Sequence, residues 1–217
     1  MHSWLHEQRH VAAQRTRSLP RGALLCGMLS TLLTPLASAA VTTCPRAVFF
    51  DLGNTLVEAG PGGLNVLRAG AQLTVDQLQA AGVRIGVITN VPADWDRADL
   101  EAVLAQPEFL DEFEVVILSS QAPAPKPSPL IYQHAYTQLM LPAPLITETA
   151  FVGETLAEIA NMQVNPTSGA RSVGMIGIHL SDAAPSALTD FTLPFNGLTQ
   201  IPTLISGLCP VFVDSFE

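Results

Sequence analysis

Five runs of apolar residues recur along the chain, and each is followed by a polar or glycine-rich segment. They cover residues 46–51, 84–89, 114–119, 149–153 and 173–180. Because these runs are continuously apolar rather than alternating, they are typical of strands buried on both faces of a sheet. Segments with helical spacing separate them, so the order of elements predicts an α/β fold. We expect a three-layer sandwich around a central, mostly parallel five-stranded sheet.

The segments between the strands carry helix signals. Apolar residues from Leu64 to Leu78 recur at helical spacing, and Gly82 follows them as a helix terminator. Ser128 and Pro129 suit the cap and the first position of another helix. Shorter helices are predicted over residues 97–105, after Thr155 and near residues 199–206.

Residues 1–39 have the composition of a leader. Four Arg and one Glu are followed by an apolar stretch from Ala23 to Leu36 and then by Ala37-Ser38-Ala39-Ala40, as in a secretory signal peptide. The alternative is a buried helix or an uncleaved anchor, although the stretch is shorter than the ~20 residues that span a bilayer. We expect a signal peptide over residues 1–39 and one domain over residues 40–217. The protein would be exported, periplasmic or secreted, with no stable membrane insertion after cleavage.

The charge of the chain argues against a nucleic-acid partner. Lys and Arg together number 10 against 19 Asp and Glu, which gives a net charge of −9. Removing residues 1–39, with their four Arg and one Glu, changes that charge to −12. A basic surface for a phosphate backbone is therefore not expected. A hydrophobic content of 48% favours a packed core over a disordered chain.

Two cysteines, Cys44 and Cys209, remain once the leader is removed. An even number of cysteines in an exported chain permits a disulfide bond. Two unpaired cysteines are the alternative, and the sequence leaves both open.

Chemically active side chains lie at or just beyond the ends of four predicted strands. They are Asp51, Thr89, Lys126, which is the only lysine in the chain, and Glu154. In an open parallel sheet, the carboxyl ends of the strands gather at one edge. There a carboxylate can act as nucleophile, a hydroxyl and an ammonium can hold phosphoryl oxygens, and a second carboxylate can hold a divalent cation. The set therefore favours a phosphate site.

Four segments that contain these residues resemble the motifs of the haloacid dehalogenase-like hydrolase superfamily. They are residues 49–56 (FFDLGNTL), 85–90 (IGVITN), 126–132 (KPSPLIY) and 151–154 (FVGE). The resemblance covers roughly residues 46–180, nearly all of the predicted domain. It implies a Rossmann-like sheet, a Mg²⁺ cofactor and a covalent intermediate on an aspartate.

The resemblance also implies a role for each polar residue in the motifs. Asp51 would be the nucleophile, and Thr89 and Lys126 would complete the catalytic set. Thr89, the backbone N–H of Asn90 and Lys126 would bind the substrate phosphate.

The metal ligands that the resemblance implies are the Asp51 carboxylate, the Gly53 carbonyl and the Glu154 carboxylate, with Glu158 as a further acid of the metal site. Glu154 replaces the more usual Asp but is still an oxygen ligand suited to Mg²⁺. A solvated helix face is the alternative for Glu158.

Gly53 is the main departure from the family pattern. Many family phosphatases have a second Asp at this position, which acts as general acid and then as general base. Such proton transfer is typically worth ~10²–10⁴-fold in rate. Another carboxylate or water would have to replace it, or turnover would be slow.

The spacing between motifs leaves no room for a sizeable cap domain. Asp51 and Thr89 are 38 residues apart, and Thr89 and Lys126 are 37 residues apart. One turn and one helix fill the first gap, and one helix and one strand fill the second. An open site is therefore expected.

The sequence thus predicts an enzyme, an exported Mg²⁺-dependent phosphomonoesterase that forms an aspartyl-phosphate on Asp51. Its partner would be a phosphorylated small molecule or an exposed phosphoryl group. The alternative is a catalytically degenerate relative that binds a phosphorylated ligand or a protein partner, and Gly53 and Glu154 favour that alternative.

Overall fold

The structure is a computed structural model that describes residues 44–139, 143–160 and 168–209. These residues belong to one compact unit, Ala39–Glu217. The predicted signal peptide, residues 1–39, lies outside the described residues. No helix in the described part of the chain is long and apolar enough to cross a membrane.

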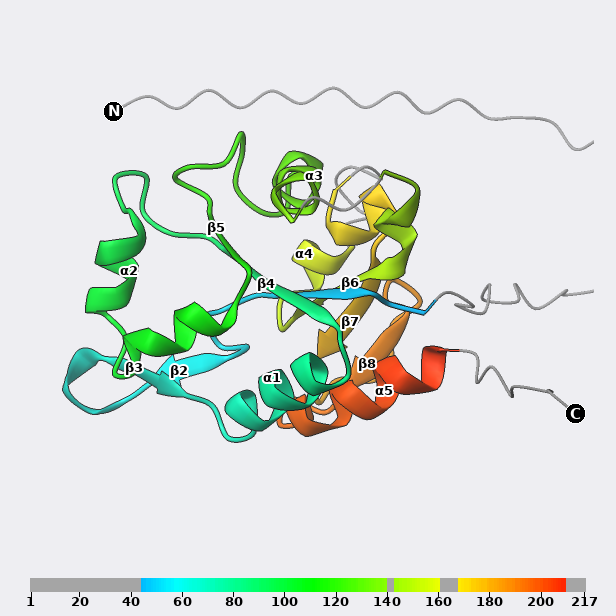
Figure 1. Ribbon diagram of the computed structural model, residues 1–217, viewed down its shortest axis with the longest axis horizontal. Helices are drawn as coiled ribbons and strands as arrows, with labels where there is room; N and C mark the ends of the chain where they lie inside the picture. The colour runs from blue at the N-terminus through cyan, green and yellow to red at the C-terminus, as the bar shows by residue number, and fades with distance from the viewer. Residues whose placement is uncertain (1–43, 140–142, 161–167, 210–217) are drawn as a thin grey trace, which may run out of the picture. The chain divides into compact units, whose positions relative to one another are not determined.

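The centre of the fold is a six-stranded sheet in which every neighbouring pair of strands is parallel (Figure 1). Its order is β5-β4-β1-β6-β7-β8. The strands are β1 (Ala47–Phe50), β4 (Arg84–Thr89), β5 (Val115–Leu118), β6 (Thr149–Gly153), β7 (Ile176–Leu180) and β8 (Phe191–Leu193). All five predicted strands are present. The sequence analysis missed β8, which has only three residues and is half-buried at the edge of the sheet.

Helices cover both faces of this sheet, as the continuously apolar strands predicted. Figure 1 shows α1 and α5 on one side and α3 and α4 on the other. Alternate residues of β1 separate the two cores, because Phe50 packs with α1 and α5 while Phe49 packs with α3 and α4. The α-helices are α1 (Ala71–Ala80), α2 (Arg97–Ala102), α3 (Pro129–Gln138), α4 (Leu156–Ile159) and α5 (Ile201–Leu208). The 3₁₀ turns are η1 (Pro61–Gly63), η2 (Pro107–Glu112), η3 (Ala143–Glu148), η4 (Ala170–Val173) and η5 (Leu198–Gln200).

The helix predicted from Leu64 begins later, at Ala71. Residues 65–67 instead form β3 (Asn65–Leu67), which pairs antiparallel with β2 (Val57–Ala59). Gly70 separates this hairpin from α1 with a left-handed φ of 85°, and a Cβ there would lie 2.6 Å from the Thr199 side chain. The segment from Asp51 to Thr89, all of it described, therefore holds one small hairpin, η1, α1 and the strand β4.

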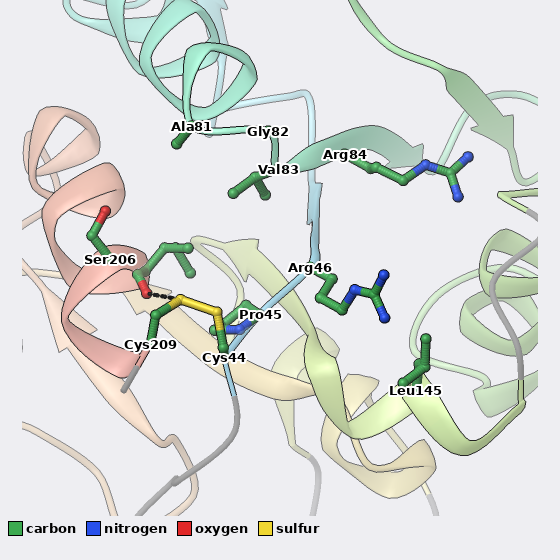
Figure 2. Close-up of a pocket in the computed structure, with 11 residues that line it drawn as sticks. Cys44, Pro45, Arg46, Ala81, Gly82, Val83, Arg84, Leu145, Ser206 and Cys209 are labelled. Atoms are coloured by element: carbon green, nitrogen blue, oxygen red, sulfur yellow. Dashed lines mark hydrogen bonds between the residues drawn. A yellow bond between two sulfur atoms is a disulfide. The ribbon is translucent and has the colours of Figure 1, made fainter. Parts of the chain in front are cut away.

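Cys44 and Cys209 form a disulfide bond, so the structure decides the question that the sequence left open. Figure 2 shows the bridge in the wall of a pocket of about 500 Å³, at the amino end of β1 and the end of α5. The bridge closes a loop with a sequence separation of 165 residues.

We expect the variant with Cys44→Ser and Cys209→Ser to lose up to about 5 kcal/mol of unfolding free energy, because its unfolded chain is no longer constrained by a long loop. Urea unfolding of the oxidised protein and the double variant measures the difference. The double variant should be insensitive to dithiothreitol, whereas the oxidised protein should fall to its stability when reduced. Equal stability of all samples would contradict the prediction.

Candidate active site

The parallel sheet brings three of the predicted site residues to one edge. Asp51 continues β1, and its backbone N–H donates to the Val152 carbonyl at 2.8 Å. Glu154 directly follows β6, the neighbour of β1 on one side, and Thr89 ends β4, the neighbour on the other. The carboxyl ends of the three central strands therefore carry a carboxylate, a second carboxylate and a hydroxyl.

Lys126 reaches this edge from the connection between β5 and α3. Its Nζ forms a hydrogen-bonded ion pair with Asp51 Oδ1 and lies 2.8 Å from Glu158 Oε2. The Lys126 side chain is 1% exposed, and the exposed fractions of Asp51 and Glu158 are 9% and 15%. A buried ammonium thus bridges two carboxylates from different elements.

The Asn90 side chain positions Lys126. Its Nδ2 donates to the Lys126 carbonyl at 3.1 Å, and its Oδ1 accepts from the Lys126 backbone N–H at 2.9 Å. The sequence analysis assigned only the backbone N–H of Asn90 to the site and missed this role of the side chain. The two residues are 36 positions apart, so no local pattern indicates the contact.

Glu158 lies in α4 and faces Lys126, so it is not on a solvated helix face. The Tyr132 hydroxyl donates to the Glu158 backbone carbonyl at 2.6 Å and fixes this part of α4 against α3. The structure therefore gives Glu158 a place beside the lysine. Its role in holding a metal stays a prediction.

One hydroxyl group contacts Asp51, and a second lies at the end of the neighbouring strand β4. Thr55 Oγ1 donates to Asp51 Oδ2 at 3.3 Å, a contact that the sequence analysis missed although Thr55 is in the first motif. Thr89 is 6% exposed, and its hydroxyl has no hydrogen-bond partner among the described residues. A phosphoryl oxygen would give the Thr89 hydroxyl an acceptor.

The site carries more negative than positive charge. Burial raises the pKa of the Asp51 carboxyl above its usual value, the Lys126 ammonium opposes this shift, and the Glu154 carboxylate adds to it. Burial likewise raises the pKa of Glu158, again against Lys126, and the Asp51 and Glu154 carboxylates contribute to the rise. Three carboxylates therefore repel one another around a single lysine, and a bound cation would reduce this repulsion.

The residues at this edge fit Mg²⁺ by their chemistry. Within the described ranges, no group of three or more His, Cys, Asp and Glu side chains is arranged to hold a metal ion. Mg²⁺ does not need such a cage, because it keeps several waters and commonly binds through one or two carboxylates. Asp51, Glu154 and the Gly53 carbonyl would supply hard oxygen ligands of this kind.

Gly53 leaves open space where the family pattern has an acid. A Cβ at this position would meet nothing within 4 Å, and the backbone there is not left-handed. The absence of a side chain is therefore not forced by packing, and a carboxylate at position 53 can be accommodated.

The family model for haloacid dehalogenase-like hydrolases matches residues 62–162. This range contains Thr89, Asn90, Lys126, Glu154 and Glu158. No curated protein matches the chain.

Several solved structures share the fold. A HAD-superfamily hydrolase from Ehrlichia chaffeensis has a TM-score of 0.56 and 16% identity over 76% of this chain and 98% of its own. A HAD phosphatase from Thermococcus onnurineus has a TM-score of 0.51 and 23% identity over 65% of this chain and 59% of its own. L-2-haloacid dehalogenase from Xanthobacter autotrophicus has a TM-score of 0.58 and 14% identity over 76% of this chain and 100% of its own.

Proposed function

The chain belongs to the haloacid dehalogenase-like hydrolase superfamily, and from that premise we propose that it is an exported, Mg²⁺-dependent phosphomonoesterase. The observation that carries the proposal is the buried Lys126 ammonium, held between Asp51 and Glu158 at the carboxyl edge of the sheet. A compact, water-excluded ammonium beside a carboxylate suits a phosphoryl group, whose oxygens it can attract while the carboxylate attacks phosphorus.

The proposed reaction has two steps, both centred on Asp51. A carboxylate oxygen of Asp51 attacks phosphorus, the bond from phosphorus to the ester oxygen breaks, and the departing alkoxide takes a proton from water, because Gly53 offers no acid. Water then attacks the aspartyl-phosphate, which releases inorganic phosphate and a proton and restores the Asp51 carboxylate. Lys126, the Thr89 hydroxyl and the Asn90 N–H hold the phosphoryl oxygens.

Mg²⁺ bound by Asp51, the Gly53 carbonyl and Glu154 would neutralise part of the phosphate charge beside the nucleophile. Asn90 and Thr55 serve the same arrangement from the protein side. Asn90 fixes the backbone of Lys126, and the Thr55 hydroxyl orients the Asp51 carboxylate.

The solved structures with this fold include a phosphatase and haloacid dehalogenases, and the two reactions differ in the group that the site must hold. A haloacid presents one carboxylate and a carbon centre, whereas a phosphoryl group presents several oxygens. The donors at this edge come from two parts of the chain, namely Thr89 and the backbone of Asn90 at the end of β4, and Lys126 after β5. This distribution supports a phosphoryl group as the substrate.

Hydrolysis of p-nitrophenyl phosphate by the mature protein tests the proposal. We expect release of nitrophenol and phosphate with added Mg²⁺, loss of turnover in EDTA and recovery when Mg²⁺ is restored. Chloride release from 2-chloropropionate is the parallel assay for dehalogenation. Dehalogenation without phosphatase activity would overturn the proposal, and so would activity indifferent to EDTA. Export is tested separately, because the mass of the protein from its native host should correspond to cleavage near Ala39.

Gly53 favours the second candidate, a relative that binds a phosphorylated ligand but turns it over slowly. We expect Gly53→Asp to raise kcat by about 10²-fold, because a carboxyl at this open position can protonate the leaving group. Gly53→Asn is the matched control, since it has the same shape but no proton to exchange. If Asp and Asn give equal rates, the missing acid does not limit turnover.

A further inference from the structure

A pocket of about 450 Å³ opens at the carboxyl edge of the sheet, and Glu154 is one of the residues that line it. Its walls come from residues that follow four parallel strands, namely Asn54 after β1, Glu154 after β6, Asp182 after β7 and Phe195 after β8. The pocket therefore lies along the same carboxyl edge as Asp51. Glu154 is common to the pocket and to the proposed metal site, so a group attached to a phosphoryl on Asp51 would extend into this space.

The buried Arg68 fastens two walls of the pocket to each other. Its side chain is 7% exposed, and it donates to the Asn54 carbonyl at 2.7 Å and to the Phe195 carbonyl at 2.9 Å. The guanidinium carbon also lies 3.9 Å from the centre of the Phe195 ring. The segment after β1, beside the nucleophile, is thereby held against the segment after β8, 127 residues away from Arg68.

Two side chains of the pocket, Phe195 and Asp182, are held in place and remain available to a ligand. Phe195 remains 37% exposed, because Arg68 covers one face of the ring and the pocket adjoins it. Its backbone N–H donates to Asp182 Oδ1 at 3.0 Å, which holds the Asp182 carboxylate at the pocket wall. An aromatic surface and a fixed carboxylate thus line the same pocket as Glu154.

The charges of the residues that line the pocket determine which substrate charge it favours. Glu154 and Asp182 are acidic, and none of the described residues that line the pocket is Lys, Arg or His. The nearby positive charge of Arg68 is directed to two backbone carbonyls and to the Glu58 carboxylate at 3.6 Å. Mg²⁺ would engage Glu154, so Asp182 is the acid left to face the rest of the substrate. A second anionic group there would be repelled by Asp182 with no Lys, Arg or His among the described lining residues, whereas an ammonium group would meet the Asp182 carboxylate.

We propose that this pocket receives the alcohol part of the phosphomonoester and selects an alcohol that carries a positive charge, such as an amino alcohol. The inference rests on the proposed function, because it places the phosphoryl group on Asp51. It assigns specificity to Asp182, with Phe195 as the apolar surface for the carbon chain and Arg68 as a positioning residue for both walls.

Three small esters of different charge test the proposal, namely O-phosphoethanolamine, glycerol 3-phosphate and 3-phosphoglycerate. We expect kcat/KM to fall in that order, by about tenfold or more between the first and the last. Asp182→Asn keeps an oxygen for the Phe195 N–H but removes the charge, so the ratio between these two esters should fall several-fold. Glu108→Gln removes an exposed acid outside the pocket and is the matched control, in which the ratio should be unchanged.

The outcomes separate the pocket from the proposed reaction. If p-nitrophenyl phosphate is hydrolysed but the three esters show no charge preference, or Glu108→Gln changes the ratio as much as Asp182→Asn, the pocket inference is wrong and the phosphatase stands. If neither p-nitrophenyl phosphate nor any of the three esters is hydrolysed, the proposed phosphatase function is wrong. Calorimetric Kd values of the same three esters then test the pocket inference. Equal Kd values would then overturn it, and tighter binding of O-phosphoethanolamine that weakens in Asp182→Asn would support it.

Discussion

Asp51→Asn is expected to lower kcat for p-nitrophenyl phosphate by about 10³-fold or more, to the background of the assay, because the amide cannot form the phosphoryl ester. The amide keeps the shape of the carboxylate, its oxygen can still accept from Lys126, and its NH₂ group can donate to the Thr55 hydroxyl. Lys126 also retains its ion pair with Glu158, so the fold should persist.

Circular dichroism and urea unfolding of Asp51→Asn separate loss of chemistry from loss of structure. Asp76→Asn is the matched control, since Asp76 is exposed on α1 and its contact is with Gln72, four residues away. That variant should keep the activity of the unchanged protein. Retention of more than a tenth of the activity by Asp51→Asn would show that Asp51 is not the nucleophile.

Lys126→Met should remove activity and also lower the free energy of unfolding by about 3–5 kcal/mol at neutral pH, because it leaves buried carboxylates without their cation. Arg84→Met is the matched control. It breaks the ion pair between Arg84 and Glu114, whose side chains are 37% and 44% exposed respectively. Such surface pairs contribute about 1 kcal/mol or less to stability.

The loss in Lys126→Met should depend on pH in a defined direction. Lys126 lowers the pKa values of Asp51 and Glu158, so removing it raises their folded-state values further above those of the unfolded chain. The folded variant then binds more protons than its unfolded chain. Its loss of unfolding free energy relative to the unchanged protein therefore shrinks as pH falls from 8 to 5. Urea unfolding at several pH values measures this trend. A deficit that is constant or grows toward pH 5 would contradict the prediction.

The strands were predictable because their signal is local. The continuously apolar segments that became β1, β4, β5, β6 and β7 indicate burial on both faces without knowledge of their neighbours. The hairpin was not predictable in the same way. Leu64 and Leu67 continue the spacing of α1, and only the pairing of β3 with β2 and the left-handed Gly70 separate the two elements.

The site residues also differ in how far a local sequence pattern predicts them. Asp51, Thr89 and Glu154 follow apolar strands, so topology alone gathers them at one edge. Other contacts around the site join residues that are far apart in the sequence, as between Asn90 and Lys126 or between Arg68 and the carbonyl of Phe195. Such contacts depend on the packing of loops and leave no periodic trace in the sequence.

The disulfide has a practical consequence for handling the protein. The Cα atoms of Cys44 and Cys209 are 4.2 Å apart, so the first and last described residues of the domain meet at one point. That point lies at the amino end of β1, whereas Asp51 follows the carboxyl end of the same strand. A solid support or carrier attached there would hold the domain at the amino end of β1 and leave the edge that carries Asp51 accessible. The same proximity makes the domain suited to circular permutation, with the two cysteine positions joined by a short linker and new ends opened at an exposed turn.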